Sequence, residues 1–308
     1  MQSVNIDIKI FVILLLLTFS ASSNIKAQGC SDAGFCSLHS LKPEEKSETI
    51  LHNHISAGIA FGKGENEINI VSPYLQFTRN INTCLSFSGK ILFTSVKGEL
   101  GNVNGISDAF ISSNYSVGSQ TGLTLGLKIP FNDGNTKLNN IPLPMAYQTS
   151  LGTFDIIAGV SHSHSNFEFM AAIQQPLTQN KNQFFSGLYP PDSEAQKYQS
   201  TNNYKRSGDI LFRASYTFNI NNGRFKIKPG LLPIYHLSND KFTDGAGVEQ
   251  SIEGSQGFTI NGNLFLVYSI DKKNTIEISF GAPMKSRTSR PDGLTRKFAA
   301  SLEYKVSF

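Results

Sequence analysis

The last twelve residues of the chain alternate between an apolar series and a more polar series of side chains. The apolar series is Phe298, Ala300, Leu302, Tyr304, Val306 and Phe308. The intervening series is Lys297, Ala299, Ser301, Glu303, Lys305 and Ser307. Because successive side chains of a β-strand point to opposite faces, this period of two predicts a strand with one apolar and one polar face.

The same period of two recurs along most of the chain. Its apolar positions in the C-terminal half are Phe167, Phe169, Ala171 and Ile173, then Ile210, Phe212, Ala214, Tyr216, Phe218 and Ile220, then Phe225 and Ile227, then Phe258, Ile260, Leu264, Leu266, Tyr268 and Ile270, and then Ile276, Ile278 and Phe280. Similar strands are expected upstream at 49–62, 67–79, 82–96, 106–116, 121–131 and 149–163. The pattern predicts an all-β protein of about twelve strands.

Charged residues occupy positions between these apolar ones, on the opposite face of the predicted strands. They are Glu168, Arg213, Lys226, Lys228, Glu277 and Glu303. On a face toward hydrocarbon, a lysine or arginine would cost roughly 2–4 kcal/mol, whereas the interior of a transmembrane barrel is polar. We therefore expect a transmembrane antiparallel β-barrel in which these six residues line the lumen.

The lengths of the connections also favour a membrane barrel, since such barrels alternate short turns at one end with longer loops at the other. Short turns are predicted at 79–82, 118–121, 163–166, 221–223 and 271–274. The remaining connections are 63–66, 97–105, 132–148, 178–207, 238–254 and 285–295, of which only the first is tight. A soluble β-sandwich has no reason to sort its connections in this way. The parity predicts that both termini of the barrel are periplasmic.

The N-terminus predicts export. Lys9 precedes the apolar run 10–17, and small and polar residues follow it through Ser23, which is the pattern of a signal peptide. The run is shorter than the roughly 20 apolar residues of a membrane-spanning helix. The small residue Ala27 provides a cleavage position.

Cleavage there divides the chain into three parts. They are a signal peptide (1–27), a periplasmic N-terminal extension (28–48) and an outer-membrane β-barrel (49–308). Lipidation at Cys30 is an alternative, but Ala27-Gln28-Gly29 lacks the aliphatic residue that a lipobox carries three positions before its cysteine.

Composition and charge add little to this interpretation. Charged residues make up 16% of the chain, Gly and Phe contribute 26 and 23 residues, and Trp is absent, which a soluble β-sandwich would share. Removal of 1–27 takes away Asp7, Lys9 and Lys26 and lowers the formal net charge from +4 to +3. A charge this small gives no reason to expect a nucleic acid partner. No residue pattern calls for a cofactor.

Two cysteines, Cys30 and Cys36, lie in the extension, with His39 nearby. In an oxidising compartment, two thiols six residues apart favour a disulfide over a metal site, which would require more closely spaced ligands. The third cysteine, Cys84, is predicted to face the lumen near the periplasmic mouth, where it could instead pair with Cys30 or Cys36. The segment 29–36 resembles one in outer-membrane barrels of Bacteroidota.

The run Tyr235-His236-Leu237-Ser238-Asn239 resembles the His-any-Ser-Asn core of outer-membrane phospholipase A. The resemblance implies a lipid hydrolase in which His236 takes the proton of Ser238 and both face lipid. With Tyr235 outward, however, alternation points His236 and Ser238 inward, and Asp240 replaces the glycine that usually ends the motif. The alternative is a polar strand end that leads into a loop.

Two other sets of residues have alternative interpretations. His162 and His164 share one face of their strand and could hold a metal, but no third ligand is visible, which favours a pair without that function. Arg213, Lys226 and Lys228 lie on adjacent strands and could form a wall that attracts anions. The alternative for this basic set is a lumen network balanced by Glu168, Glu277 and Glu303.

The end of the chain on Phe308 resembles the C-terminal strand signal of bacterial outer-membrane barrels. The resemblance implies recognition by the barrel-insertion machinery and a position among outer-membrane lipids.

A second resemblance concerns Gly122-Leu123-Thr124-Leu125-Gly126-Leu127-Lys128-Ile129-Pro130-Phe131 and, after a long loop, Gly152-Thr153-Phe154-Asp155. These segments are similar to the outer-membrane transporters grouped with the meta-pathway of phenol degradation, which are distantly like the long-chain fatty-acid channels. The resemblance implies passage of small hydrophobic or aromatic compounds, with 28–48 as the segment that plugs the barrel.

About twelve strands fall between the eight-stranded barrels that side chains fill and the open porins of 16–18 strands, which predicts a narrow pore or a single-ligand cavity. The expected function is therefore that of a non-enzymatic channel or transporter for small solutes, hydrophobic or anionic. An outer-membrane lipid hydrolase and a structural or adhesive barrel are the alternatives.

Overall fold

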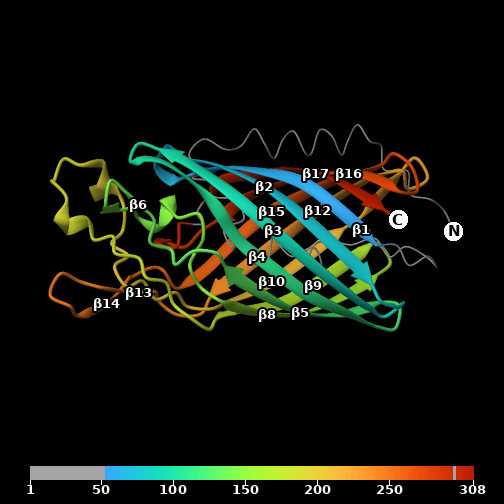
Figure 1. Ribbon diagram of the computed structural model, residues 1–308. Coiled ribbons are helices and arrows are strands. Elements are labelled where there is room, and N and C mark those ends of the chain that lie inside the picture. The colour runs from blue at the N-terminus through green and yellow to red at the C-terminus, as the bar shows by residue number, and fades with distance from the viewer. Residues whose placement is uncertain (1–52, 294–295) are drawn as a thin grey trace.

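The computed structural model describes residues 53–293 and 296–308, which form one closed antiparallel β-barrel (Figure 1). Its strands are β1 (His54–Gly64), β2 (Asn69–Asn80), β3 (Leu85–Gly98), β4 (Gly101–Val117), β5 (Thr121–Pro130), β8 (Asp155–His164), β9 (Phe167–Pro176), β10 (Asp209–Tyr216), β11 (Phe218–Ile220), β12 (Phe225–His236), β15 (Gly257–Ser269), β16 (Asn274–Lys285) and β17 (Arg296–Ser307). β10 and β11 both pair with β12 and are parted only at Thr217, so they form one span and the barrel has twelve. β1 pairs with β17, which closes the sheet. The predicted all-β barrel of about twelve strands is confirmed.

The polarity of the barrel wall follows the alternation in the sequence. On β2, the side chain of Leu75 on the outer face is 58% exposed, whereas its neighbour Gln76 on the inner face is 4% exposed. The outer face carries many other exposed apolar side chains, such as Phe87 and Phe93 of β3. An apolar exterior around a polar interior is the arrangement that a bilayer requires of a β-barrel, because lipid cannot solvate charged or hydrogen-bonding groups.

The connections contain four short 3-10 helices and two small hairpins. The helices are η2 (Glu65–Glu67), η3 (Met145–Tyr147), η4 (Ser186–Leu188) and η5 (Glu194–Lys197). The hairpins are formed by β6 (Lys137–Leu138) with β7 (Ile141–Pro142), and by β13 (Lys241–Thr243) with β14 (Glu249–Ser251). Within the described residues, no helix has the length and apolar character needed to cross a bilayer.

The five short turns predicted from the sequence lie at one end of the barrel and all the long connections at the other, where short connections also join β1 to β2 and β3 to β4 (Figure 1). We call these the turn end, where the chain terminates, and the loop end, which carries β6, β7, β13 and β14. The two ends correspond to the predicted parity of short and long connections.

Two expectations are wrong. The strand expected at 149–163 begins only at Asp155, because 149–154 belongs to the connection that leads into β8. The loop expected at 97–105 is mostly strand. β3 and β4 continue beyond the predicted strand ends and are joined only through Glu99 and Leu100, with Gly98 paired to Gly101. Gly101 has a φ of +136°, which side-chain-bearing residues rarely adopt. The polar and glycine-rich sequence 101–105 looked like a loop, but it forms backbone hydrogen bonds with β3.

Large and small side chains divide the barrel interior into two halves. The inner faces of β4, β8, β9, β10 and β12 pack an apolar core of Phe110, Ile157, Met170, Ala172, Leu211, Leu232 and Ile234. On the opposite wall, the paired row of Gly62 in β1, Ala299 in β17 and Gly281 in β16 projects almost no side chain inward. This difference in side-chain size between the two walls leaves space on one side of the lumen, beside the small residues.

Candidate solute-binding cavity in the lumen

The space beside the small-residue wall is a cavity of about 170 Å³. Its cover at the loop end is the segment 145–151, which folds into the barrel and buries Met145 and Leu151. A single water needs about 10–15 Å³ of such space, so the cavity has room for a small organic molecule.

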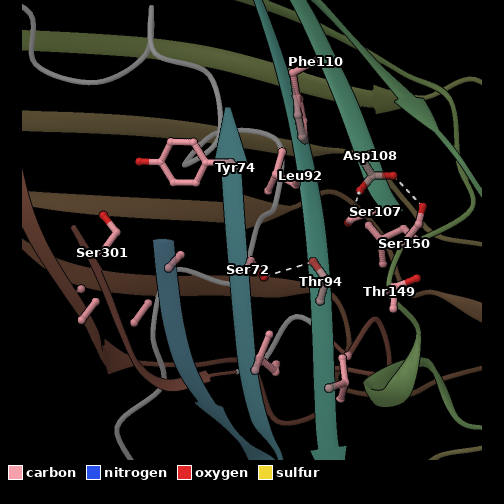
Figure 2. Close-up of a pocket in the computed structure, with 18 of the residues that line it drawn as sticks. Ser72, Tyr74, Leu92, Thr94, Ser107, Asp108, Phe110, Thr149, Ser150 and Ser301 are labelled. Carbon is pink, nitrogen blue, oxygen red and sulfur yellow. Dashed lines mark hydrogen bonds between the residues drawn. The ribbon is translucent and has the colours of Figure 1, made fainter. Parts of the chain in front are cut away.

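One wall of the cavity is a band of hydroxyl groups that runs across neighbouring strands (Figure 2). The Ser72 and Thr94 hydroxyls are 3.1 Å apart, and those of Ser279 and Ser301 are 2.7 Å apart. Strand pairing places Ala60 between Ser72 and Ser301, and Thr94 reaches Ser72 from β3, so the band follows one register row across β3, β2, β1, β17 and β16. The wall therefore offers hydrogen bonds at two points separated by a methyl group.

Toward the turn end, Tyr74 crosses the lumen wall from β2 to β17. Its hydroxyl donates a 2.6 Å hydrogen bond to Oε2 of Glu303, and Lys90 Nζ lies 3.7 Å from the centre of its ring. The strand between them contributes Gly58, whose position is paired with both Tyr74 and Glu303. Any side chain at position 58 would occupy the space of the Tyr74 ring.

A β-bulge brings a carboxylate to the cavity. Leu92 of β3 lies opposite two residues of β4, Ser107 and Asp108, and both of these are buried on the inner side. The Asp108 carboxylate accepts hydrogen bonds from Ser150 at 2.5 Å and from Ser107 at 3.5 Å (Figure 2). The contact with Ser150 fixes the inward-folded segment to the barrel wall.

The inward-folded segment is anchored again where it leads into β8. Lys128 Nζ lies 3.1 Å from Oδ2 of Asp155 and donates a 2.8 Å hydrogen bond to Thr153, whose hydroxyl donates to Asp155 at 2.6 Å. Gln174 also donates to Asp155. All of these side chains are buried. A buried ion pair is retained when hydrogen bonds satisfy its remaining atoms, as they do here.

A second buried ionic cluster closes the loop end. His236 is hydrogen-bonded through Nδ1 to Asp209 at 2.6 Å and through Nε2 to Asp240 at 2.7 Å. Arg206 pairs with Asp209, and its Nε lies 4.0 Å from Asp292. These contacts join the connections before β10, after β12 and before β17.

Tyr204 completes this cluster from the loop side. Its hydroxyl donates a 2.8 Å hydrogen bond to Asp240. Burial, together with the charge of Asp240, raises the pKa of the Tyr204 phenol. The phenol therefore stays a hydrogen-bond donor at any physiological pH.

The geometry of His236 does not fit a hydrolase. Both ring nitrogens are occupied by carboxylates, and the ring is buried inside the barrel. Ser238 lies beyond the end of β12, is exposed, and donates to Ser207 at 2.9 Å. The expected inward position of Ser238 is not observed, because β12 ends at His236 and the alternation ends with it. A histidine with no free nitrogen cannot take the serine proton.

The structure places the lumen charges predicted from the sequence as follows. Arg213 and Lys228 are buried on the inner faces of β10 and β12, and Lys226 pairs with Asn219 across the tight turn. Arg213 interacts electrostatically with Glu168 and Glu277, so the cations and the carboxylates form one mixed network.

Several lumen residues were not singled out from the sequence as candidate site residues. Lys305 lies beside Lys226, and Lys90, Tyr74 and Asp108 line or border the cavity. Alternation places Lys90 and Lys305 on the inner faces of their strands and could also have indicated Tyr74. For Asp108 alternation gives opposite faces when it is counted from Ile106 and from Ile111, because the bulge in β4 lies between them.

The histidine and cysteine predictions have separate outcomes. His162 and His164 share the outer face of β8 at the turn end, and His162 Nδ1 lies 3.1 Å from the hydroxyl of Thr121. Among the described residues, no three potential ligands are grouped for a metal.

Cys84 is an exposed free thiol in the turn before β3 rather than in the lumen, because β3 begins one residue later. Cys30 and Cys36 lie outside the described residues.

Comparison with known proteins supports the fold. No protein-family model matches the chain, and no curated protein matches it. Among solved structures, an outer-membrane channel from Pseudomonas putida F1 superimposes with a TM-score of 0.56 at 11% identity, over 86% of this chain and 98% of the other. The CymD monoaromatic hydrocarbon channel gives a TM-score of 0.46 at 10% identity, over 93% and 99% of the two chains. The first likeness shows that the chain has the fold of an outer-membrane channel.

Proposed function

We propose that this protein is an outer-membrane channel for small solutes, with the loop end outside the cell and the turn end in the periplasm. The observation that carries the proposal is the polar cavity inside a closed barrel whose outer surface is apolar. A barrel with only a structural role would not require empty space next to a wall of glycine and alanine. The short turns, which are typical of the periplasmic side, support the orientation.

The charges between the cavity and the turn end support a preference for anions. Among the described residues, the inner face there carries the cations Lys90, Arg213, Lys226, Lys228 and Lys305 and the carboxylates Glu168, Glu277 and Glu303. Excess charge of one sign in a narrow, low-dielectric passage concentrates counter-ions. The three carboxylates reduce this field, so the preference is modest.

The chemistry of the cavity supports solutes that also have an apolar part. Phe110, Phe265 and Leu151 line the cavity together with the hydroxyl band. This agrees with the passage of small hydrophobic compounds that the sequence resemblance implies. Membership of the meta-pathway transporter group is part of the proposal.

The partners proposed for this barrel are outer-membrane lipid and the barrel-insertion machinery. Phe308 is hydrogen-bonded through its backbone to Asn53, at 2.9 and 3.0 Å, and its side chain is exposed beside the end of β17. An exposed terminal aromatic residue on the last strand fits a signal that is read during insertion.

Planar-bilayer recording of the purified protein tests the proposal. We expect discrete conductance steps. In a salt gradient, the reversal potentials should show that anions pass more readily than cations. The double variant Lys226→Gln, Lys228→Gln should weaken the preference, most at low salt, where charges are screened least. Lys137→Gln with Lys181→Gln removes the same charge from exposed loop positions and serves as the control. A protein that inserts without conducting would contradict the channel.

A further inference from the structure

Asp108 is a buried carboxylate whose partners are neutral. Its side chain is 3% exposed and its hydrogen bonds come from the hydroxyls of Ser150 and Ser107. Within residues 53–293 and 296–308, no lysine, arginine or histidine nitrogen forms an ion pair with it. Lys128, the cation whose charge acts on it, is bound to Asp155 and Thr153. A buried carboxylate in this condition is stabilised by any cation that reaches it.

Hydrogen-bond donors are gathered elsewhere in the same cavity. Arg213 and Lys90 border it, and each of the two hydroxyl pairs uses one O–H within the pair. Because a hydroxyl pair has two hydrogens and one is shared, one O–H in each pair remains for a ligand. These groups together suit a carboxylate, which only accepts hydrogen bonds.

Apolar side chains line the rest of the cavity. They are Leu92, Phe110 and Phe265 from the strands, and Met145 and Leu151 from the cover. A ligand whose two charged groups meet Asp108 and the donor groups would therefore place its uncharged side chain against them.

We infer that the cavity binds a small zwitterion of the neutral amino acid class, whose ammonium group meets Asp108 and whose carboxylate meets Arg213 and the hydroxyl band. The inference deepens the proposed channel function by naming the class of solute held in the lumen. It also agrees with a net positive lumen, because the cations along the inner wall attract the carboxylate end, and Asp108 receives the ammonium end.

Three matched ligands test the inference by calorimetry on the purified full chain in detergent. Leucine has both charged groups, 4-methylpentanoate lacks the ammonium group, and 3-methylbutylamine lacks the carboxylate, while the carbon skeleton is retained. We expect leucine to bind about 10- to 100-fold more tightly than either analogue, since a hydrogen bond to a charged group contributes about 1.5–3 kcal/mol. Equal binding of all three, or tighter binding of either analogue, would overturn the inference.

Two variants assign the ends of the ligand. Asp108→Asn should weaken the binding of leucine and of 3-methylbutylamine but not that of 4-methylpentanoate. Arg213→Gln should weaken the binding of leucine and of 4-methylpentanoate but not that of 3-methylbutylamine. Asp192→Asn removes a carboxylate from an exposed loop position and should leave all three unchanged. If either variant fails to fold, the comparison of the three ligands on the unaltered chain still decides.

Conductance is measured separately, so the two proposals can fail independently. A protein that binds leucine selectively but does not conduct would contradict the channel and support the binding site. A protein that conducts but binds leucine no better than its analogues would contradict the binding site and leave the channel standing.

Discussion

Tyr74 reaches Glu303 over the bare backbone of Gly58, and the hydrogen bond that joins them measures 2.6 Å. A Cβ built on Gly58 would lie 2.3 Å from Cζ of Tyr74, closer than any real contact. Gly58→Ala should therefore displace the ring and break the bond to Glu303, with a loss of about 1–3 kcal/mol of stability, as overpacking typically costs. Urea unfolding, followed by the heat-modifiable gel mobility of the barrel, measures this loss.

Gly89→Ala is the matched control for that substitution. Gly89 lies on the outer side of β3, and a Cβ there would meet nothing within 4 Å. Both variants lose the same backbone flexibility, so equal stabilities would show that the space occupied by Tyr74 is not the reason for glycine at position 58.

Acyl hydrolysis should be independent of the histidine. We expect His236→Ala to leave any lipid hydrolysis by the purified protein unchanged, because both nitrogens of the ring are hydrogen-bonded to carboxylates and Ser238 is directed to Ser207. Release of fatty acid from phospholipid vesicles with calcium present is the measurement. A loss of calcium-dependent release in this variant would mean that the geometry of His236 changes in the membrane.

Thiol labelling of intact cells should report the orientation of the barrel. With the exposed Cys84 replaced by serine, a cysteine at Ser193 at the loop end should react with a membrane-impermeant maleimide, whereas one at Asn222 at the turn end should not. Both should react after the cells are broken. If only the Asn222→Cys variant were labelled on intact cells, the barrel would have the opposite orientation, with the turn end outside the cell.

The pairing of the cysteines is a further prediction. We expect a disulfide between Cys30 and Cys36, because closing so short a loop costs little chain entropy, and a free thiol at Cys84, which is exposed in its turn. Peptide mapping without reduction identifies the bonded pair. A peptide that links Cys84 to either of the others would instead tether the N-terminal extension to the barrel.

Acid should loosen the β13–β14 hairpin at the loop end. Hydrogen bonds from Lys205 and Lys241 lower the pKa of Glu249 from 4.5 to about 2. A carboxylate with a lowered pKa contributes stability that is complete above about pH 4.5 and is lost as the pH falls toward 2. An NMR titration of Glu249 should show a midpoint near 2 that rises toward 4.5 when both lysines are replaced by glutamine. An unchanged midpoint would show that the two ion pairs do not form in solution.

The amino-acid sequence by itself determined the barrel and its polarity. Strict alternation, as in 297–308, defines both faces of a strand without any knowledge of its neighbours, because the geometry of an extended chain is local. The alternation of short and long connections can likewise be read along the chain without knowledge of strand pairing, and it correctly separated the two ends of the barrel. This reasoning failed at 97–105, because glycine and asparagine occur in turns as readily as at the end of a hairpin. It also failed at 149–154, which was expected in a strand but belongs to the connection before β8.

Only the tertiary structure decided what lies inside the barrel. The bulge at Ser107 and Asp108 places two consecutive residues in the lumen, and strand alternation forbids such a pair. The cavity exists because the register brings Ala299 and Gly281 together opposite a core of large side chains. From the sequence His236 resembles part of a hydrolase motif. In the structure its Nδ1 is hydrogen-bonded to Asp209, which lies 27 positions earlier in the chain. Such contacts depend on which strands pair and in what register, and that is a property of the closed barrel as a whole.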